Sequence, residues 1–115
     1  MSTVDVDQLS GELLDRAARG SAHRAASTLP HGVDGLRQTL IALLAGAELG
    51  EHESPGPASL LVLRGRVRVL AGGEAVEVGT HEFSPLPDRR HSLRADEDSV
   101  VLLSVAIRVQ APLAD

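Results

Sequence analysis

Residues 5–19 carry apolar side chains at a helical spacing. The apolar positions, which recur every three or four residues, are Val6, Leu9, Leu13 and Ala17. This spacing places them on one face of a helix, and Asp5 with Gln8 is a potential capping box at its start. Gly20 marks its end. The pattern therefore predicts a short amphipathic helix, whose arginines are expected to lie on a solvated face rather than to read DNA.

The chain after this helix consists of short apolar segments separated by glycine and proline. Residues 21–29 are rich in small side chains and alternate weakly, which indicates an edge strand. A turn follows at Pro30, Gly32 and Gly35. Residues 36–45 predict a strand that ends at Gly46, although their leucine and alanine content also suits a helix.

The clearest period-2 alternation lies in residues 59–70, SLLVLRGRVRVL. It predicts a strand with a row of arginines on its solvent face. The row consists of Arg64, Arg66 and Arg68, around Gly65. Gly72 and Gly73 then predict the turn of a β-hairpin, whose second strand carries Glu77 opposite the arginines.

The remaining apolar segments predict three more strands, over residues 81–87, 91–95 and 99–109. The first is broken by two prolines. In the second, His91, Leu93 and Ala95 share one face. The third is apolar throughout and is expected to be buried on both faces. Many short strands between glycine and proline turns predict an all-β barrel or sandwich.

Composition narrows the classes of function. At 115 residues the chain fits one domain. A formal charge of −5 and a single aromatic residue, Phe83, leave neither a positive field nor stacking rings for nucleic acid. There is no lysine for a Schiff base and no cysteine for thiolate chemistry or disulfides. The first residues lack a targeting pattern and no apolar stretch reaches membrane-spanning length, so we expect a cytoplasmic protein that binds neither nucleic acid nor membrane.

The stretch Gly46 to Gly65 resembles the first conserved motif of the cupin superfamily. That motif is a glycine, five residues, His-x-His, three or four residues, a glutamate, six residues and a glycine. On this chain the corresponding positions are Gly46, His52, Ser54, Ala58 and Gly65. Both glycines and the first histidine match, while serine and alanine replace the second histidine and the glutamate.

Residues 79–93 resemble the second cupin motif, a glycine, five residues, Pro-x-Gly, two residues, a histidine, three residues and an asparagine. Gly79 and Pro85 match in register. Pro87 stands at the glycine position, and His91 lies one residue beyond the histidine position. The asparagine cannot be present, because the chain contains none.

The resemblance to small single-domain cupins implies an all-β fold, a double-stranded β-helix (jelly-roll) barrel with a short N-terminal helix. The domain organisation expected from it is a helix and edge strand in residues 1–29, the barrel in residues 30–110 and a C-terminal tail in residues 111–115. It also implies a homodimer in which residues 21–29 contribute, because such cupins commonly pair their N-terminal strands and an open sheet edge needs covering.

The ligand set that the resemblance implies is incomplete. Only His52 and His91 carry over as metal ligands, with Ser54 as a further pocket residue. Glu51 or Glu53 is a candidate third ligand, provided that a bulge near Gly50 or Pro55 changes the alternation. The pair His52 and His91 has two interpretations. The two histidines either bind one divalent metal weakly (Zn, Ni, Fe or Mn) or line a pocket without metal.

Three functions from different classes fit these features. The first is a cupin that binds a small, partly apolar organic ligand, non-catalytic or regulatory, in a pocket lined by His52, Ser54 and His91. The alternative is a divalent-metal-dependent enzyme of the dioxygenase or isomerase type. The third is a structural or interaction module. The remaining candidates are His23, His31 and His81, expected as exposed polar residues, and Asp88-Arg89-Arg90, which resembles an anion-binding cluster but also suits a solvated turn.

Overall fold

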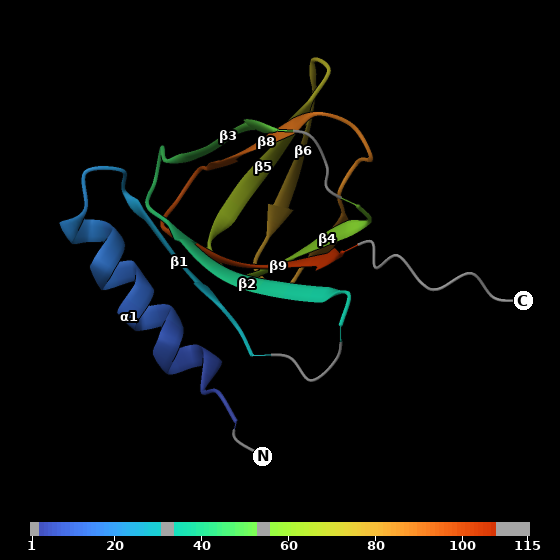
Figure 1. The fold of residues 1–115 in the computed structure, drawn as a ribbon. Helices are drawn as coiled ribbons and strands as arrows, with labels where there is room; N and C mark the ends of the chain where they lie inside the picture. Colours follow the sequence, from blue (N-terminus) through green and yellow to red (C-terminus); the bar gives the residue numbers. More distant parts are fainter. Residues whose placement is uncertain (1–2, 31–33, 53–55, 108–115) are drawn as a thin grey trace, which may run out of the picture.

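The structure is a computed structural model that describes residues 3–30, 34–52 and 56–107, without the side chains of Glu51 and His52. From the N-terminus its elements are α1 (Val6–Arg19), β1 (Arg24–Thr28), β2 (Leu36–Leu43), β3 (Glu48–His52), β4 (Ala58–Arg64), β5 (Arg66–Ala71), β6 (Glu74–Gly79), β7 (Phe83–Pro85), β8 (His91–Ala95) and β9 (Ser99–Ala106). The strands form a five-stranded sheet, in the order β1-β2-β9-β4-β7, and a four-stranded sheet, in the order β3-β8-β5-β6. The two sheets face each other, and the predicted all-β barrel is confirmed (Figure 1).

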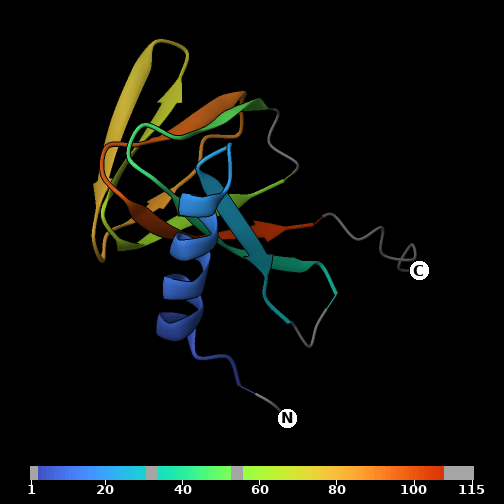
Figure 2. The same cartoon turned by 90° about the vertical axis from the view of Figure 1, so that its left-hand side faces the viewer.

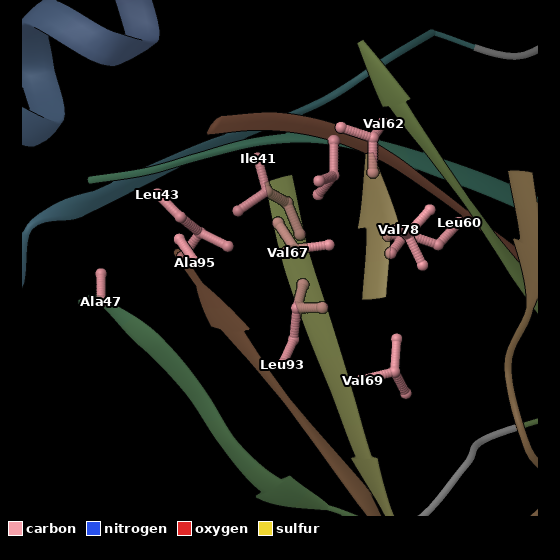
Figure 3. Close-up of a cluster of buried hydrophobic side chains, with 11 residues drawn as sticks. Ile41, Leu43, Ala47, Leu60, Val62, Val67, Val69, Val78, Leu93 and Ala95 are labelled. Carbon is pink, nitrogen blue, oxygen red and sulfur yellow. The ribbon is translucent and has the colours of Figure 1, made fainter. Parts of the chain in front are cut away.

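The inner faces of the two sheets enclose the main hydrophobic core. Alternate residues of each strand point inward, as the period of two requires. The buried side chains of this core are Ile41, Leu43, Ala47, Leu60, Val62, Val67, Val69, Val78, Leu93, Ala95 and Val101 (Figure 3). All of them are aliphatic, so this core is packed without a Phe, Tyr or Trp ring.

Helix α1 covers the outer face of the five-stranded sheet, beside β1 and β2 (Figures 1 and 2). Leu13 and Ala17 have no exposed surface and pack against Leu40, Ala42 and Val100 of the sheet. The helix begins as predicted, because Asp5 accepts a hydrogen bond from the Gln8 backbone (3.0 Å). No helix in the described part of the chain is long and apolar enough to cross a membrane.

Most of the predicted strands are confirmed. Residues 21–29 contain β1, which lies at the edge of its sheet, and residues 36–45 contain β2, which ends at Leu43, rather than a helix. The predicted hairpin is the β5–β6 pair, with Gly72 and Gly73 at positive φ in its turn. Gly32 in the first predicted turn, the end of the last predicted strand and the C-terminal tail lie outside the described residues.

The prediction of one strand over residues 59–70 is wrong. Gly65, at φ +84°, turns the chain from β4 in one sheet to β5 in the other, which resets the alternation. Arg64 therefore pairs with Asp7 of α1 (2.6 Å). Of the three arginines, only Arg66 and Arg68 face Glu77, with guanidinium nitrogens 4.0 and 3.3 Å from its carboxylate oxygens. The expected row of three arginines does not exist, because its members belong to different sheets.

The Gly65 corner has no space for a side chain. Ser99, whose hydroxyl accepts a hydrogen bond from the Arg66 backbone (3.0 Å), packs directly against the glycine. A methyl group at position 65 would overlap the Ser99 hydroxyl and lie 2.5 Å from the carbonyl oxygen of Asp98. The corner thus depends on glycine for both its backbone conformation and its close packing.

We predict that Gly65→Ala lowers the free energy of unfolding far more than Gly73→Ala. Both glycines have nearly the same φ, +84° and +83°, but nothing lies within 4 Å of a methyl group at Gly73. Gly73→Ala should therefore show only the backbone cost, roughly 1–2 kcal/mol. Gly65→Ala adds the overlap, on the order of 1–3 kcal/mol more. Urea denaturation of both variants measures the difference, and equal losses would show that the corner relaxes freely.

Candidate functional site

His91 is a buried histidine at the start of β8. Its residue is 4% exposed, and it shares the inner face of the strand with Leu93 and Ala95. The inward phase that the alternation predicts for these three residues is confirmed. His91 therefore presents an imidazole to the interior of the barrel, where the other walls are largely aliphatic.

A small cavity lies beside His91 between the two sheets. It is lined by Ile41, Leu49, Leu60, Val69, Leu86, His91, Ser92, Leu93 and Leu103. It leaves about 20 Å³ for the centre of a water-sized sphere, which is enough for about one water molecule. Sites for organic ligands are typically hundreds of cubic ångströms in size, about 300–1,000 Å³. An organic ligand in this cavity requires its walls to move.

The backbone of Arg89 fixes the orientation of the His91 ring. The Nδ1 atom of His91 lies 2.8 Å from the carbonyl oxygen of Arg89. Because a carbonyl oxygen only accepts hydrogen bonds, Nδ1 carries the proton and the neutral ring has its lone pair on Nε2. Histidines that bind metals in proteins are commonly held in this way.

The backbone of β3 brings position 52 opposite His91. In the antiparallel β3–β8 ladder, Leu49 pairs with Leu93 and His52 pairs with His91, so β3 contains one extra residue between the two pairs. This bulge, at Gly50 and Glu51, gives position 52 the same phase as Leu49. Paired positions share one face of a sheet. The register therefore brings the two histidine positions together.

The rest of the predicted metal set lies outside the described residues. Ser54 and Glu53 belong to the undescribed residues 53–55, and the side chains of His52 and Glu51 are not described. Within the described part, no group of three or more histidine, aspartate or glutamate side chains is placed to hold a metal ion. One imidazole does not make a divalent metal site, so the described donors do not fit the complete ligand set of a cupin.

The other polar candidates lie away from the cavity. His23 and His81 are exposed residues at positive φ, and His31 lies outside the described residues. On the outer face of the four-stranded sheet, the hydrogen bond of Arg68 to Asp96 (2.9 Å) and the charges of Asp96 and Glu77 raise the pKa of the Arg68 guanidinium above its ordinary value. This charge network is on the opposite face of β5 from Val67 and Val69, so it does not act on the site.

Two features of the site were not predicted from the sequence. Leu86 forms part of the cavity wall, and its position directly after the matched Pro85 was the available signal. The carbonyl of Arg89 orients His91, but a backbone acceptor has no signature in a sequence.

Solved structures with the same fold include cupins. No family model and no curated protein matches the sequence. A conserved Streptococcus pyogenes protein of unknown function is 25% identical, with a TM-score of 0.72 over 94% of this chain and 89% of its own. A cupin superfamily protein from Desulfitobacterium hafniense is 16% identical, with a TM-score of 0.68 over 74% and 78%. Salicylate 1,2-dioxygenase from Pseudaminobacter salicylatoxidans is 16% identical, with a TM-score of 0.74 over 86% of this chain and 33% of its own.

These likenesses, together with the order of the strands, define the fold of the chain. The chain has the cupin fold, as its two motifs indicate. The low identities show the fold alone, so the function must be argued from this chain's own residues.

We predict that neutral His91 carries its proton on Nδ1. Nitrogen-15 NMR of the imidazoles, at a pH where they are neutral, should show a protonated Nδ1 and an unprotonated Nε2 for His91, because its Nδ1 faces a carbonyl oxygen at 2.8 Å. The exposed His23 and His81 serve as internal references for a solvated ring. A proton on Nε2 of neutral His91 would contradict the hydrogen bond to Arg89.

Proposed function

We propose that this protein is a cupin that binds a small organic ligand without catalysing a reaction on it. The observation that carries the proposal is the imidazole of His91, the one buried histidine ring among the described side chains, in an otherwise largely aliphatic wall. Ligand sites commonly combine apolar walls with a few polar groups that fix the ligand's orientation. In this proposal His91 orients the ligand, with His52 and Ser54 as further contacts. A sensing or regulatory role follows from binding without reaction.

The proposed ligand is small and partly apolar. Leu49, Leu60 and Leu103 supply aliphatic walls, which favour an apolar body on the ligand. Sugars usually stack on aromatic rings, and Phe83, the one aromatic residue, lies 64% exposed on β7. Because the cavity has room for about one water, we expect binding to displace a wall residue such as Leu86.

The alternative function is that of a divalent-metal-dependent enzyme. It is favoured by the orientation of His91, whose Nδ1 is held by the Arg89 carbonyl, and by the register that places His52 opposite His91. This function needs a carboxylate from Glu51 or Glu53 in addition to the two histidines. A metal bound there would supply a Lewis acid, and His91 would hold it through Nε2.

We predict that the purified protein carries less than one divalent metal per chain after dialysis. Two imidazoles without an assured carboxylate bind a metal more weakly than a complete set of histidines and carboxylate. Elemental analysis by mass spectrometry measures the content. His52→Ala and His91→Ala should remove any metal, while His23→Ala, at an exposed position on the β1 side, should leave it unchanged.

The opposite result would change the ranking of the two functions. A full equivalent of metal that survives chelator treatment would show that a third ligand completes the site. In that case Glu51→Gln and Glu53→Gln identify the carboxylate by loss of metal, and the enzyme becomes the first choice.

We also propose a homodimer that forms through the open edge of β1. The backbone of Leu29 donates to Gln38 (2.8 Å) and that of Leu44 donates to His23 (3.0 Å), so odd-numbered residues of this segment bond to β2. The N–H groups of Ala26 and Thr28 therefore point away from β2, toward the edge of the sheet. An edge of this kind is a template for another strand.

We predict that Ala26→Pro converts the dimer to a monomer. Proline removes an N–H group that faces the open edge and leaves the bonds to β2 in place. The dissociation constant should rise at least about tenfold, a loss of roughly 1.4 kcal/mol. Light scattering at micromolar concentration measures the mass, with Ala26→Val as the control that keeps the N–H group. A monomeric wild-type protein under these conditions would refute the dimer.

A further inference from the structure

A second hollow lies between the β5–β6 hairpin and the segment that follows β7. It is lined by Val69, Ala71, Glu74, Val76, Ser84, Pro85, Leu86, Pro87 and Arg89. This groove leaves about 260 Å³ for the centre of a water-sized sphere, whereas the inner cavity leaves about 20 Å³. Val69 and Leu86 separate the two, since both residues line both hollows. The volume of the groove lies just below the roughly 300–1,000 Å³ that is typical of ligand sites, so the groove suits only a small molecule.

The walls of the groove are apolar and preformed. Val76 pairs with Val69 across the hairpin, so both belong to the inner face of the sheet. Val69 is 5% exposed, but Val76 is 53% exposed because β6 is the last strand of its sheet. Pro85 and Pro87 form the opposite wall with fixed φ angles. An inward-facing valine thus lines an open groove instead of a closed core.

Two opposite charges line the groove. The distance between Arg89 Nη2 and Glu74 Oε1 is 3.7 Å. A charge-assisted hydrogen bond is shorter, about 2.7–2.9 Å. Their side chains are 52% and 79% exposed. The pair is therefore loose, and each group can turn to a ligand at little cost.

The backbone of Arg89 is anchored, and its guanidinium lies against the hairpin turn. Its backbone carbonyl is bonded to the buried ring of His91. A methyl group on Gly72, in the hairpin turn, would be 3.0 Å from Nη1 of Arg89. The cation thus lies next to the apolar wall of Val76 and Pro85.

We propose that this groove binds a zwitterionic aliphatic α-amino acid of about the size of leucine. Its carboxylate binds Arg89, its ammonium group binds Glu74, and its side chain packs on Val76, Pro85 and Leu86. Arg89 and Glu74 are the only charged residues among the groove's described walls. A simple carboxylic acid would meet the repulsion of Glu74, and a simple amine that of Arg89, whereas a zwitterion satisfies both. This proposal is independent of the ligand proposed for the inner cavity.

The expected affinity is low. Both charged side chains are more than half exposed, so water and salt screen their interactions with the ligand. We expect a dissociation constant on the order of 1 mM. An affinity in this range suits a site that responds to the concentration of a free metabolite.

A nitrogen-15 NMR titration with three ligands tests the chemistry. Leucine should give saturable shifts at the amides of Ala71, Val76 and Ser84, which line the groove. Leucinamide lacks the carboxylate and 4-methylpentanoate lacks the ammonium group, so each should bind at least about tenfold more weakly. Shifts that do not saturate with leucine, or equal affinities for the three ligands, would overturn the proposal.

Matched variants test the residues. Arg89→Gln and Glu74→Gln should each weaken leucine binding at least about tenfold. The control is Arg94→Gln on the outer face of the barrel, because Arg94 is 53% exposed and pairs with Glu48 at 3.8 Å, nearly as Arg89 does with Glu74. It should leave the affinity unchanged. An equal loss in the Arg94 variant would show that net charge alone governs binding and would overturn the proposal.

The two proposed sites can be distinguished. Leu103→Phe, which narrows the inner cavity, should leave leucine binding in the groove unchanged, because Leu103 lines the inner cavity and not the groove. If Leu103→Phe abolishes the leucine shifts while the rest of the spectrum is retained, leucine binds in the inner cavity and the groove assignment is wrong. If leucine binds the groove and no ligand is found for the cavity, only the function proposed for His91 fails.

Discussion

The five-stranded sheet is apolar on both faces, and the rest of the molecule is arranged to cover it. In β9, Val100 faces α1 and Val101 faces the four-stranded sheet, and neither has exposed surface. Each such side chain contributes about 1.5–3 kcal/mol through burial. Uncovering Leu13, Leu40 and Val100 together would cost several kcal/mol, a large part of the roughly 5–15 kcal/mol that stabilises a domain. The helix is therefore an integral layer of the fold.

The same packing sets the limits of the site. A barrel filled by leucine, valine and alanine interdigitates closely, which leaves space for about one water beside His91. Only at the open side of the barrel, where β6 has no neighbouring strand in the described chain, does an inward-facing residue such as Val76 remain accessible. In the interior, one imidazole can therefore orient a small group. The groove beside Val76, which is larger than the inner cavity, lies at the edge of the two sheets.

Features that depend on the phase of one residue could be predicted from the sequence, whereas features that depend on distant parts of the backbone could not. Alternation was enough to place His91 inward, and paired glycines were enough to place the hairpin turn. The corner at Gly65 was missed because Arg64 and Arg66 flank the glycine at the spacing of one continuous strand, and only the positive φ of Gly65 shows that the strand ends. The pairing of position 52 with His91 depends on a bulge, and the partner of the His91 ring is a carbonyl; neither follows from residue type. The two motifs therefore predicted the fold well but only part of the site.

The bulge in β3 couples the phase of position 52 to the number of residues before it. Position 52 shares the phase of Leu49 because three steps along β3 match two along β8. Without the bulge, regular pairing over the same three steps would transfer position 52 to the outer face of the sheet, with every residue kept. Deleting one residue between Leu49 and His52 would leave two steps against two, so position 52 would stay opposite His91 in a regular ladder. A single codon lost at this point would therefore straighten the strand and keep the two histidine positions paired, a tolerance in length that the residue types alone do not indicate.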